Sequence, residues 1–237
     1  MFYSKLQAVI AATILLAAFP FSASAQDKNL KPVEKGIDME IVFCVDTTGS
    51  MGGLIEGAKV KVWSIVNEII KQKPTPNIKI GLIAYRDQGD NYVTQVFDLS
   101  EDLDATYKSL MTFSAGGGGD TPEHVNKALD DAVTQIKWSE GPAALKVIYL
   151  VGDAPPHMDY NDGFDYHKTT ENAVKNYIYI NTIRCGNDET AGAAWQEIAR
   201  LGEGKFFSID ATGGMLAIAT PMDKELAELS SKLTSTM

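Results

Sequence analysis

The chain has 237 residues, of which 45% are hydrophobic, and it carries a formal net charge of −10. This length and composition predict a single globular domain with a substantial core. The acidic balance argues against a nucleic-acid partner, because contacts to phosphate need clustered lysine and arginine side chains.

Residues 1–25 have the pattern of an export signal. Lys5 precedes a short apolar stretch over residues 8–18, and an Ala-Ser-Ala triplet at residues 23–25 forms a cleavage site. We expect a mature periplasmic or secreted protein that begins at Gln26, with a charge of −11 after the loss of Lys5 (−10 minus one positive charge). The alternative is an uncleaved anchor helix. No later segment reaches the ~20 apolar residues that a membrane span needs.

After a polar lead-in over residues 26–37, strand-like and helix-like patterns alternate along the chain. Apolar runs of strand length predict strands, and apolar residues at helical spacing predict helices. In chain order we predict a strand at Ile41–Val45, a helix at Leu54–Ile70, strands at Ile78–Tyr85 and Tyr92–Phe97, helices at Leu103–Met111 and Pro122–Ile136, a strand at Leu145–Val151, a helix at Lys168–Asn176, a strand at Tyr177–Ile183, a helix at Ala193–Leu201, a strand at Phe206–Ile209 and a helix at Glu225–Leu233.

This alternation predicts an α/β fold. Strands that are apolar throughout are typical of a mostly parallel sheet with helices on both faces, so we expect a doubly wound, Rossmann-like sandwich. The strand Tyr92–Phe97 follows its predecessor after a short turn, and we expect it to be the one antiparallel strand, at an edge.

Three polar segments are expected to meet at one end of this sheet, beyond the carboxyl ends of the strands, where such folds bind ligands. Two of them follow strands, and the third is a loop that begins with the glycine run at residues 116–119. Their side chains offer only oxygen atoms, which hard divalent cations prefer, so we predict a site for Mg²⁺, with Mn²⁺ or Ca²⁺ as alternatives. The candidate ligands are Asp46, Thr48, Ser50, Asp120, Thr121 and Asp153.

Simpler interpretations exist for each segment. Asp46, Thr48 and Ser50 are usual helix-capping residues, and a glycine run can be a flexible linker. The order of the three segments in one compact domain favours the metal site. The segment Thr48–Gly52 also approaches the G-x-S-x-G elbow of hydrolases, but its first residue is threonine and no histidine follows residue 167.

Other polar residues suggest no chemistry of their own. His124, His157 and His167 lack the paired helical spacing of a zinc site. Asp87 and Asp90, after the second strand, are interpreted as surface charges rather than as partner contacts.

The segment Asp46-Thr47-Thr48-Gly49-Ser50 resembles the Asp-x-Ser-x-Ser signature of von Willebrand factor type A domains. The glycine run before Thr121 and the aspartate after the strand Leu145–Val151 stand where that family keeps its other two metal-site loops. The resemblance covers the chain from about Asp38 to Leu233, and the segment at residues 152–157 resembles a bacterial branch of the family better than its integrin branch. We therefore expect a von Willebrand factor type A domain over residues 38–237, of a bacterial exported type.

The resemblance implies a metal-ion-dependent adhesion site. In it, Thr48 and Ser50 would bind the ion directly, whereas Asp46 and Asp153 would bind mostly through water. One residue of the Asp120–Thr121 pair would supply the remaining ligand, with Thr121 preferred. Thr48 stands where the family more often has serine, and an aspartate precedes Thr121. If Asp120 bound the ion directly, the extra negative ligand would hold the ion more firmly and lower its attraction for an acidic partner.

The same resemblance bears on Cys44 and Cys185. The strand order of the family places the strand Leu145–Val151 between their strands. Two strand spacings come to ~9.5 Å, which exceeds the ~7 Å limit between the Cα atoms of a disulfide. We therefore predict two free thiols.

Together these features predict an exported binding module that is not an enzyme. It would hold a divalent cation and dock an unknown protein partner, through an acidic residue of that partner. The alternative from another class is a metal-dependent hydrolase that uses the same oxygen cluster, although a general base is not evident. A third possibility is a degenerate domain that binds no metal.

Overall fold

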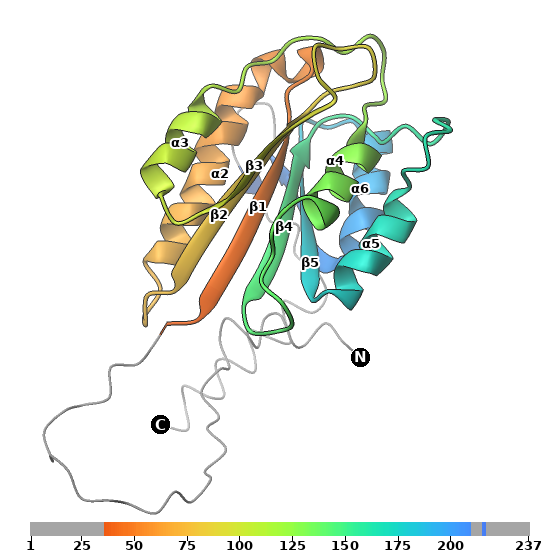
Figure 1. Ribbon diagram of the computed structural model, residues 1–237. Helices are drawn as coiled ribbons and strands as arrows, with labels where there is room; N and C mark the ends of the chain where they lie inside the picture. Colours follow the sequence, from red (N-terminus) through yellow and green to blue (C-terminus); the bar gives the residue numbers. More distant parts are fainter. Residues whose placement is uncertain (1–35, 210–214, 217–237) are drawn as a thin grey trace, which may run out of the picture.

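The computed structural model describes residues 36–209 and 215–216 (Figure 1). The predicted export signal and the predicted helix Glu225–Leu233 lie outside these residues. Within the described part of the chain, none of the helices combines the length and the apolar character needed to cross a membrane.

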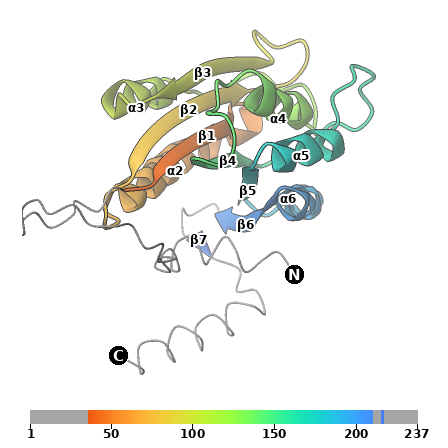
Figure 2. The same cartoon turned by 60° about the horizontal axis from the view of Figure 1, so that its bottom comes forward.

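Seven strands form one sheet in the order β3-β2-β1-β4-β5-β6-β7 (Figure 2). The parallel strands are β1 (Asp38–Asp46), β2 (Asn77–Tyr85), β4 (Leu145–Gly152), β5 (Ile178–Cys185) and β6 (Glu203–Ile209). The predicted antiparallel edge strand is confirmed as β3 (Thr94–Ser100), which pairs with β2. At the other edge, the two-residue strand β7 (Met215–Leu216) pairs antiparallel with β6. A strand of two residues has too short a pattern to be predicted from the sequence.

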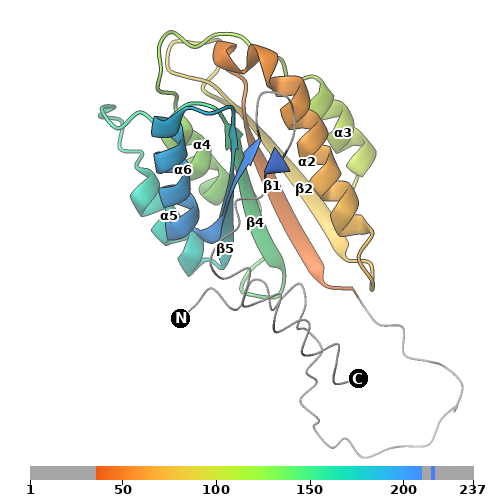
Figure 3. The ribbon, with the colours of Figure 1, turned by 180° about the vertical axis from the view of Figure 1, so that it is seen from behind.

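Helices cover both faces of the sheet, as predicted (Figures 1 and 3). One face carries α2 (Ile55–Ile70) and α3 (Leu103–Met111), and the other carries α4 (Val125–Thr134), α5 (Tyr166–Lys175) and α6 (Glu189–Leu201). Strand β1 contributes to the core on both faces: Val42 and Cys44 pack on the α4 side, and Ile41, Phe43 and Val45 on the α2 side. All five are fully buried, which explains why this strand is apolar at every position.

The chain moves outward from β1 in opposite directions. It first forms β2 and β3 on one side and then returns to build β4, β5 and β6 on the other. Strands β1 and β4 are neighbours, and the chain leaves their carboxyl ends in opposite directions, at the top of Figure 1. Doubly wound sheets bind ligands at this point, where the strand order reverses.

One helix begins later than its sequence suggests. The predicted helix from Pro122 starts at Val125, because residues 122–123 run alongside the loop after β4. The backbone N–H of Glu123 donates to Pro155 at 3.0 Å, and that of His157 donates to the carbonyl of Glu123 at 3.0 Å. These long-range bonds outweigh the local preference for a helix that starts at proline, and they hold the glycine-rich loop beside the β4 loop.

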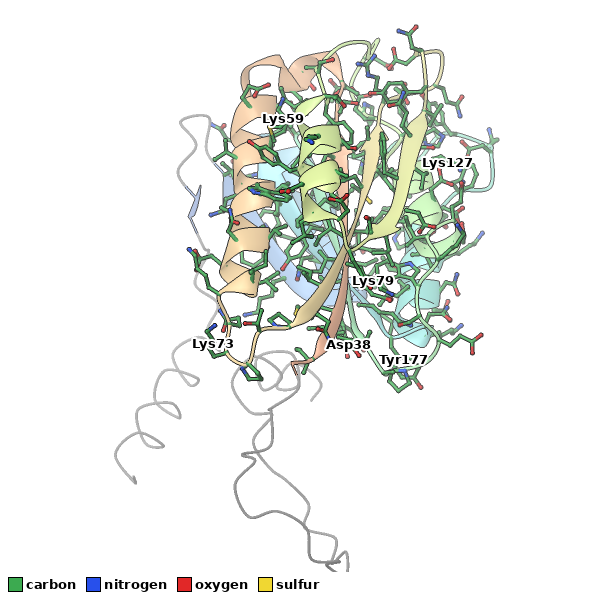
Figure 4. The ribbon with its side chains drawn as sticks, turned by 60° about the vertical axis from the view of Figure 1, so that its left-hand side comes forward. Asp38, Lys59, Lys73, Lys79, Lys127 and Tyr177 are labelled. Atoms are coloured by element: carbon green, nitrogen blue, oxygen red, sulfur yellow. The ribbon has the colours of Figure 1, made fainter. Side chains whose placement is uncertain are left out.

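A buried lysine joins α2 to the end of α3 (Figure 4). Lys59 is 4% exposed, and its Nζ donates to the carbonyls of Phe113 at 3.1 Å and Met111 at 3.4 Å. It also pairs with Glu56 at 2.6 Å. The last carbonyls of a helix have no partners within the helix, so Lys59 satisfies that of Met111, together with the carbonyl of Phe113 beyond the helix end.

The two cysteines are free and buried, as predicted. Cys44 lies in β1 and Cys185 ends β5, with β4 between them.

Candidate metal centre

Four side chains from the end of β1 and from the loops after β1 and β4 form a continuous row of polar contacts at the carboxyl end of the sheet. The hydroxyl of Thr48 donates to Asp46 Oδ1 at 2.6 Å and lies 3.1 Å from Ser50 Oγ. Ser50 donates in turn to Asp153 Oδ1 at 2.9 Å. Four of the six predicted ligands are thus brought together, and we call this set the Asp46 row.

Asp46 is fully buried at the end of β1. The backbone N–H of Thr48 donates to its Oδ1 at 2.9 Å, which curls the loop back over the strand end. Its Oδ2 atom is buried and has no hydrogen-bond partner among the described residues. Burial raises the pKa of Asp46 to about 7, helped by the charge of Asp153, while the hydrogen bonds from Thr48 and the nearby hydroxyl of Tyr85 oppose the rise. A carboxylate in this position needs either a proton or a cation for charge compensation.

A further carboxylate, which the sequence did not single out, completes the group. Glu123 is 2% exposed, and its Oε2 has no hydrogen-bond partner within the part of the chain that the structure describes. Burial raises the pKa of Glu123 to about 8, and the negative charge of Asp46 adds to the effect, whereas a hydrogen bond with Thr48 lowers it. The third loop therefore presents Glu123 to the Asp46 row.

The glycine-rich loop can approach this closely because Gly118 lacks a side chain. A Cβ atom at Gly118 would lie 3.1 Å from Glu123 Oε1 and 3.4 Å from the Cβ of Thr48, and the backbone there has a φ of +72°, which favours glycine. The N–H of Gly118 donates to Asp90 Oδ2 at 2.8 Å. Asp90 therefore anchors the loop from the β2 side.

The other two predicted ligands belong to the glycine-rich loop. Asp120 and Thr121 are both exposed. One carboxylate oxygen of Asp120 lies within 4.8 Å of ligand atoms of Asp87 and His157. The interpretation of Asp87 as a surface charge is wrong, because it is only 4% exposed. Its burial and the position of Glu123 both depend on long-range pairing of the loops, and no local pattern indicates them.

The donors that meet at the Asp46 row fit a hard divalent cation. They are the carboxylates of Asp46, Asp153 and Glu123 and the hydroxyls of Thr48 and Ser50, all oxygen ligands of the kind that Mg²⁺ and Ca²⁺ prefer. Two buried carboxylate oxygens lack partners. Among the described residues, no lysine or arginine forms an ion pair with any of the three carboxylates. The negative charge of the group is therefore uncompensated by the protein itself.

Comparison with known proteins gives an independent view of the chain. Residues 40–210 match the family model described as von Willebrand factor A domain. Three protein relatives also match. An ariadne-like RING finger protein of Acanthamoeba polyphaga mimivirus is 31% identical over 125 residues, 53% of this chain and 12% of that protein. Alpha-protein kinase vwkA of Dictyostelium discoideum is 27% identical over 144 residues, 60% of this chain and 22% of the kinase.

The third relative is von Willebrand factor A domain-containing protein 7 of Rattus norvegicus, which is 33% identical over 114 residues, 48% of this chain and 12% of that protein. The chain thus spans between 12% and 22% of the length of these relatives.

Solved structures show the same fold. The VWA domain of SpRpn10 superimposes with a TM-score of 0.56 at 19% identity, over 73% of this chain and 88% of that one. Proximal thread matrix protein 1 of the mussel byssus, in a structure with a zinc-occupied MIDAS motif, gives a TM-score of 0.57 at 16% identity, over 75% of this chain and 43% of that one. The family model covers well over half of the chain, and the sheet order and flanking helices agree with it. The chain belongs to the von Willebrand factor A domain family.

Proposed function

We propose that this chain is a binding module that holds a divalent cation, with Mg²⁺ as the preferred ion, and docks a protein partner at that ion. The residues that would hold the ion are Asp46, Thr48, Ser50, Asp153 and Glu123. When bound, the ion supplies Lewis-acid attraction for one oxygen of the partner, such as a carboxylate of an aspartate or glutamate.

The observation that carries this proposal is the unpartnered Oδ2 of the fully buried Asp46. Burying a carboxylate without charge compensation is costly, so folding alone does not explain its presence at this position. The remainder of the Asp46 row leads outward from it, because Ser50 is exposed and Asp153 is half-buried. The row therefore extends from the core to a surface that a partner can reach.

The third-loop ligand is assigned here to Glu123. The expectation that Asp120 or Thr121 supplies it stays a prediction, and the geometry favours Glu123 because it is the side chain of that loop that adjoins Thr48. A carboxylate at this position gives the site three acidic groups, which strengthens cation binding and weakens the attraction for an acidic partner.

Family membership supports the proposal in a general way. The mussel protein has a zinc-occupied MIDAS motif on a similar fold, which makes a divalent cation at this end of the sheet a reasonable expectation for the present chain. The all-oxygen donor set favours Mg²⁺ over zinc here.

Capture of partners tests the docking function. Wild-type protein and the Ser50→Ala variant are immobilised and exposed to proteins of the same compartment, with Mg²⁺ and with chelator. We expect a partner that is retained only by the wild type with Mg²⁺. Identical captures in all four conditions would remove the metal from the binding mechanism. Hydrolysis of generic ester or phosphoester substrates that needs Mg²⁺ and Ser50 would favour the hydrolase alternative instead.

We further propose that the protein is exported, on the basis of the charged, apolar and small-residue pattern of residues 1–25. Mass spectrometry of the protein expressed in a bacterial host is expected to find an N-terminus at Gln26 in the periplasmic or secreted fraction. An intact N-terminus in the cytoplasmic fraction would contradict export.

A further inference from the structure

Beside the Asp46 row, a second group of polar side chains comes together from three loops. Asp87 follows β2, Asp120 lies in the glycine-rich loop and His157 lies in the loop after β4. One potential ligand atom from each of the three lies within 4.8 Å of the other two. Asp87 and His157 are each 4% exposed, whereas Asp120 is exposed. Two buried groups and one accessible group thus face one another.

The imidazole of His157 is oriented as in a metal-binding histidine. Its Nδ1 lies 2.7 Å from Asp159 Oδ1, and its ring stacks on Tyr160 with the centroids 4.0 Å apart. Its Nε2 is buried without a hydrogen-bond partner in the described structure and lies 3.6 Å from Asp87 Oδ2. A histidine whose Nδ1–H donates to a carboxylate presents a lone pair on Nε2, and metal-ligating histidines are usually held in this way.

Asp87 also has an oxygen that the protein leaves unused. Its Oδ2 accepts a hydrogen bond from the hydroxyl of Tyr160 at 2.7 Å, whereas its buried Oδ1 has no partner among the described residues. The adjacent Arg86 does not compensate this charge, because its guanidinium donates to the carbonyl of Ser114 and lies over the ring of Tyr92. A buried carboxylate and a buried imidazole nitrogen therefore both lack partners at the same place.

We propose that Asp87, Asp120 and His157 form a second metal site, which takes a divalent transition metal such as Zn²⁺. One imidazole nitrogen with two carboxylate oxygens suits zinc, manganese or iron better than Mg²⁺. Around a tetrahedral ion with bonds of about 2.1 Å, ligand atoms are ~3.4 Å apart, close to the 3.6 Å between His157 Nε2 and Asp87 Oδ2, an oxygen that accepts from Tyr160 and keeps a second lone pair for an ion. The ligand atom of Asp120, which lies within 4.8 Å of the other two, would complete the set.

This site is separate from the Asp46 row. It shares none of the five side chains proposed to hold Mg²⁺, although both sites use the loop that runs from Gly118 to Glu123. Three protein ligands leave a fourth position open for water or for a side chain of a partner. An ion here would also fix three loops relative to one another.

Zinc binding in the presence of excess Mg²⁺ tests the proposal, measured by equilibrium dialysis and by long-range ¹H–¹⁵N spectra of the histidine rings. We expect one Zn²⁺ to bind both the wild type and the Ser50→Ala variant, with a change in one histidine, His157. Loss of a direct ligand in His157→Ala or Asp120→Asn should weaken binding by more than about 100-fold, beyond the 10–100-fold typical of outer-shell partners. The matched control is His167→Ala.

His167 is a suitable control because its Nδ1 also contacts a carboxylate, that of Asp165 at 2.8 Å, yet its ring is exposed and lies outside the cluster. Unchanged Zn²⁺ affinity in Asp120→Asn would overturn the proposal, and the exposed position of Asp120 makes this variant informative even if His157→Ala fails to fold. Zinc lost in Ser50→Ala alone would also overturn it. A wild-type protein that binds Zn²⁺ but no Mg²⁺ would contradict only the proposed function.

Discussion

Ser50 Oγ donates a 2.9 Å hydrogen bond to Asp153 Oδ1, which joins side chains that are 103 positions apart in the sequence. The contact bridges the loops after β1 and β4, two neighbouring parallel strands. It also links the exposed Ser50 to the half-buried Asp153, the last residue of the Asp46 row. The bond shows that the tertiary structure brings two predicted ligands into direct contact.

Replacement of Ser50 by alanine is expected to weaken Mg²⁺ binding by at least about 10-fold, because it removes one oxygen donor and a hydrogen bond to Asp153. At a 100-fold excess over Kd, a bound ion stabilises the wild type by ~2.7 kcal/mol, which corresponds to a rise in Tm of ~5–11 °C. Calorimetry and thermal unfolding measure both effects. The control Ser109→Ala, in a half-buried serine of α3 whose hydroxyl donates only within its own helix, to the carbonyl of Ala105, should behave as the wild type. If the Tm of the wild type does not change when Mg²⁺ is added, the proposed Mg²⁺ site is contradicted.

Asp46→Asn should separate stability from metal binding. Burial raises the folded-state pKa of Asp46 to about 7, well above the ~3.9 of an unfolded aspartate. Between these pH values the folded metal-free protein binds more protons than the unfolded chain, so its free energy of unfolding falls as the pH rises. The raised pKa of Glu123, about 8, extends this fall to higher pH.

The asparagine variant cannot ionise at this position, so its stability should depend less on pH between pH 4 and 7. We expect it to be more stable than the wild type at pH 8 in chelator and to bind Mg²⁺ poorly. Urea unfolding at several pH values measures the first effect and calorimetry the second. Glu68→Gln, at an exposed position of α2, is the control. Equal pH slopes for Asp46→Asn and the wild type would show that Asp46 is ionised in the metal-free fold.

The ligand from the third loop can be identified with three conservative variants. Glu123→Gln is expected to reduce Mg²⁺ affinity the most, because Glu123 is the buried carboxylate beside Thr48. Asp120→Asn and Thr121→Val should have much smaller effects, since the hydrogen bonds that join the described residues of the Asp46 row involve neither side chain. Titration of Mg²⁺ into each variant measures the three Mg²⁺ affinities and so ranks the three side chains by their contribution to binding. A larger loss in Asp120→Asn or Thr121→Val would restore the assignment expected from the sequence.

Lys59→Met should destabilise the fold by about 1–3 kcal/mol, because the carbonyls of Phe113 and Met111 lose their shared donor. Lys71 is an exposed lysine directly after α2, the helix that contains Lys59, and Lys71→Met should change the free energy of unfolding by no more than about 0.5 kcal/mol. Urea denaturation compares the two. If both variants unfold alike, the buried lysine contributes nothing specific to the end of α3.

The two thiols should be unreactive in the native protein. Burial raises the pKa of Cys185 to about 12 and that of Cys44 well above its usual range, so neither forms the nucleophilic thiolate at neutral pH. Ellman titration is expected to find no reactive thiol in the native state and two after denaturation without reductant. Finding none after denaturation would mean that the cysteines pair in solution.

Much of the fold could be predicted from local patterns. Residues Ile41–Val45 are apolar throughout because β1 is covered on both faces, and α2 and α3 end where they were expected to end. The start of α4 could not be predicted, because the pairing of Glu123 with residues 155–157 depends on a loop more than 30 positions away. Local propensity is weak compared with such contacts.

The sequence by itself determined the alternation of strands and helices, the family and four residues of the Asp46 row, because each follows from a periodicity or from a motif within a few positions. Only the tertiary structure decided which side chain of the glycine-rich loop lies beside Thr48 and which residues lie beside His157. Glu123 is buried while Asp120 is exposed, and their order in the chain gives no indication of this. The physical reason is that burial and charge compensation are set by the loops that the fold brings together, not by neighbours in the sequence.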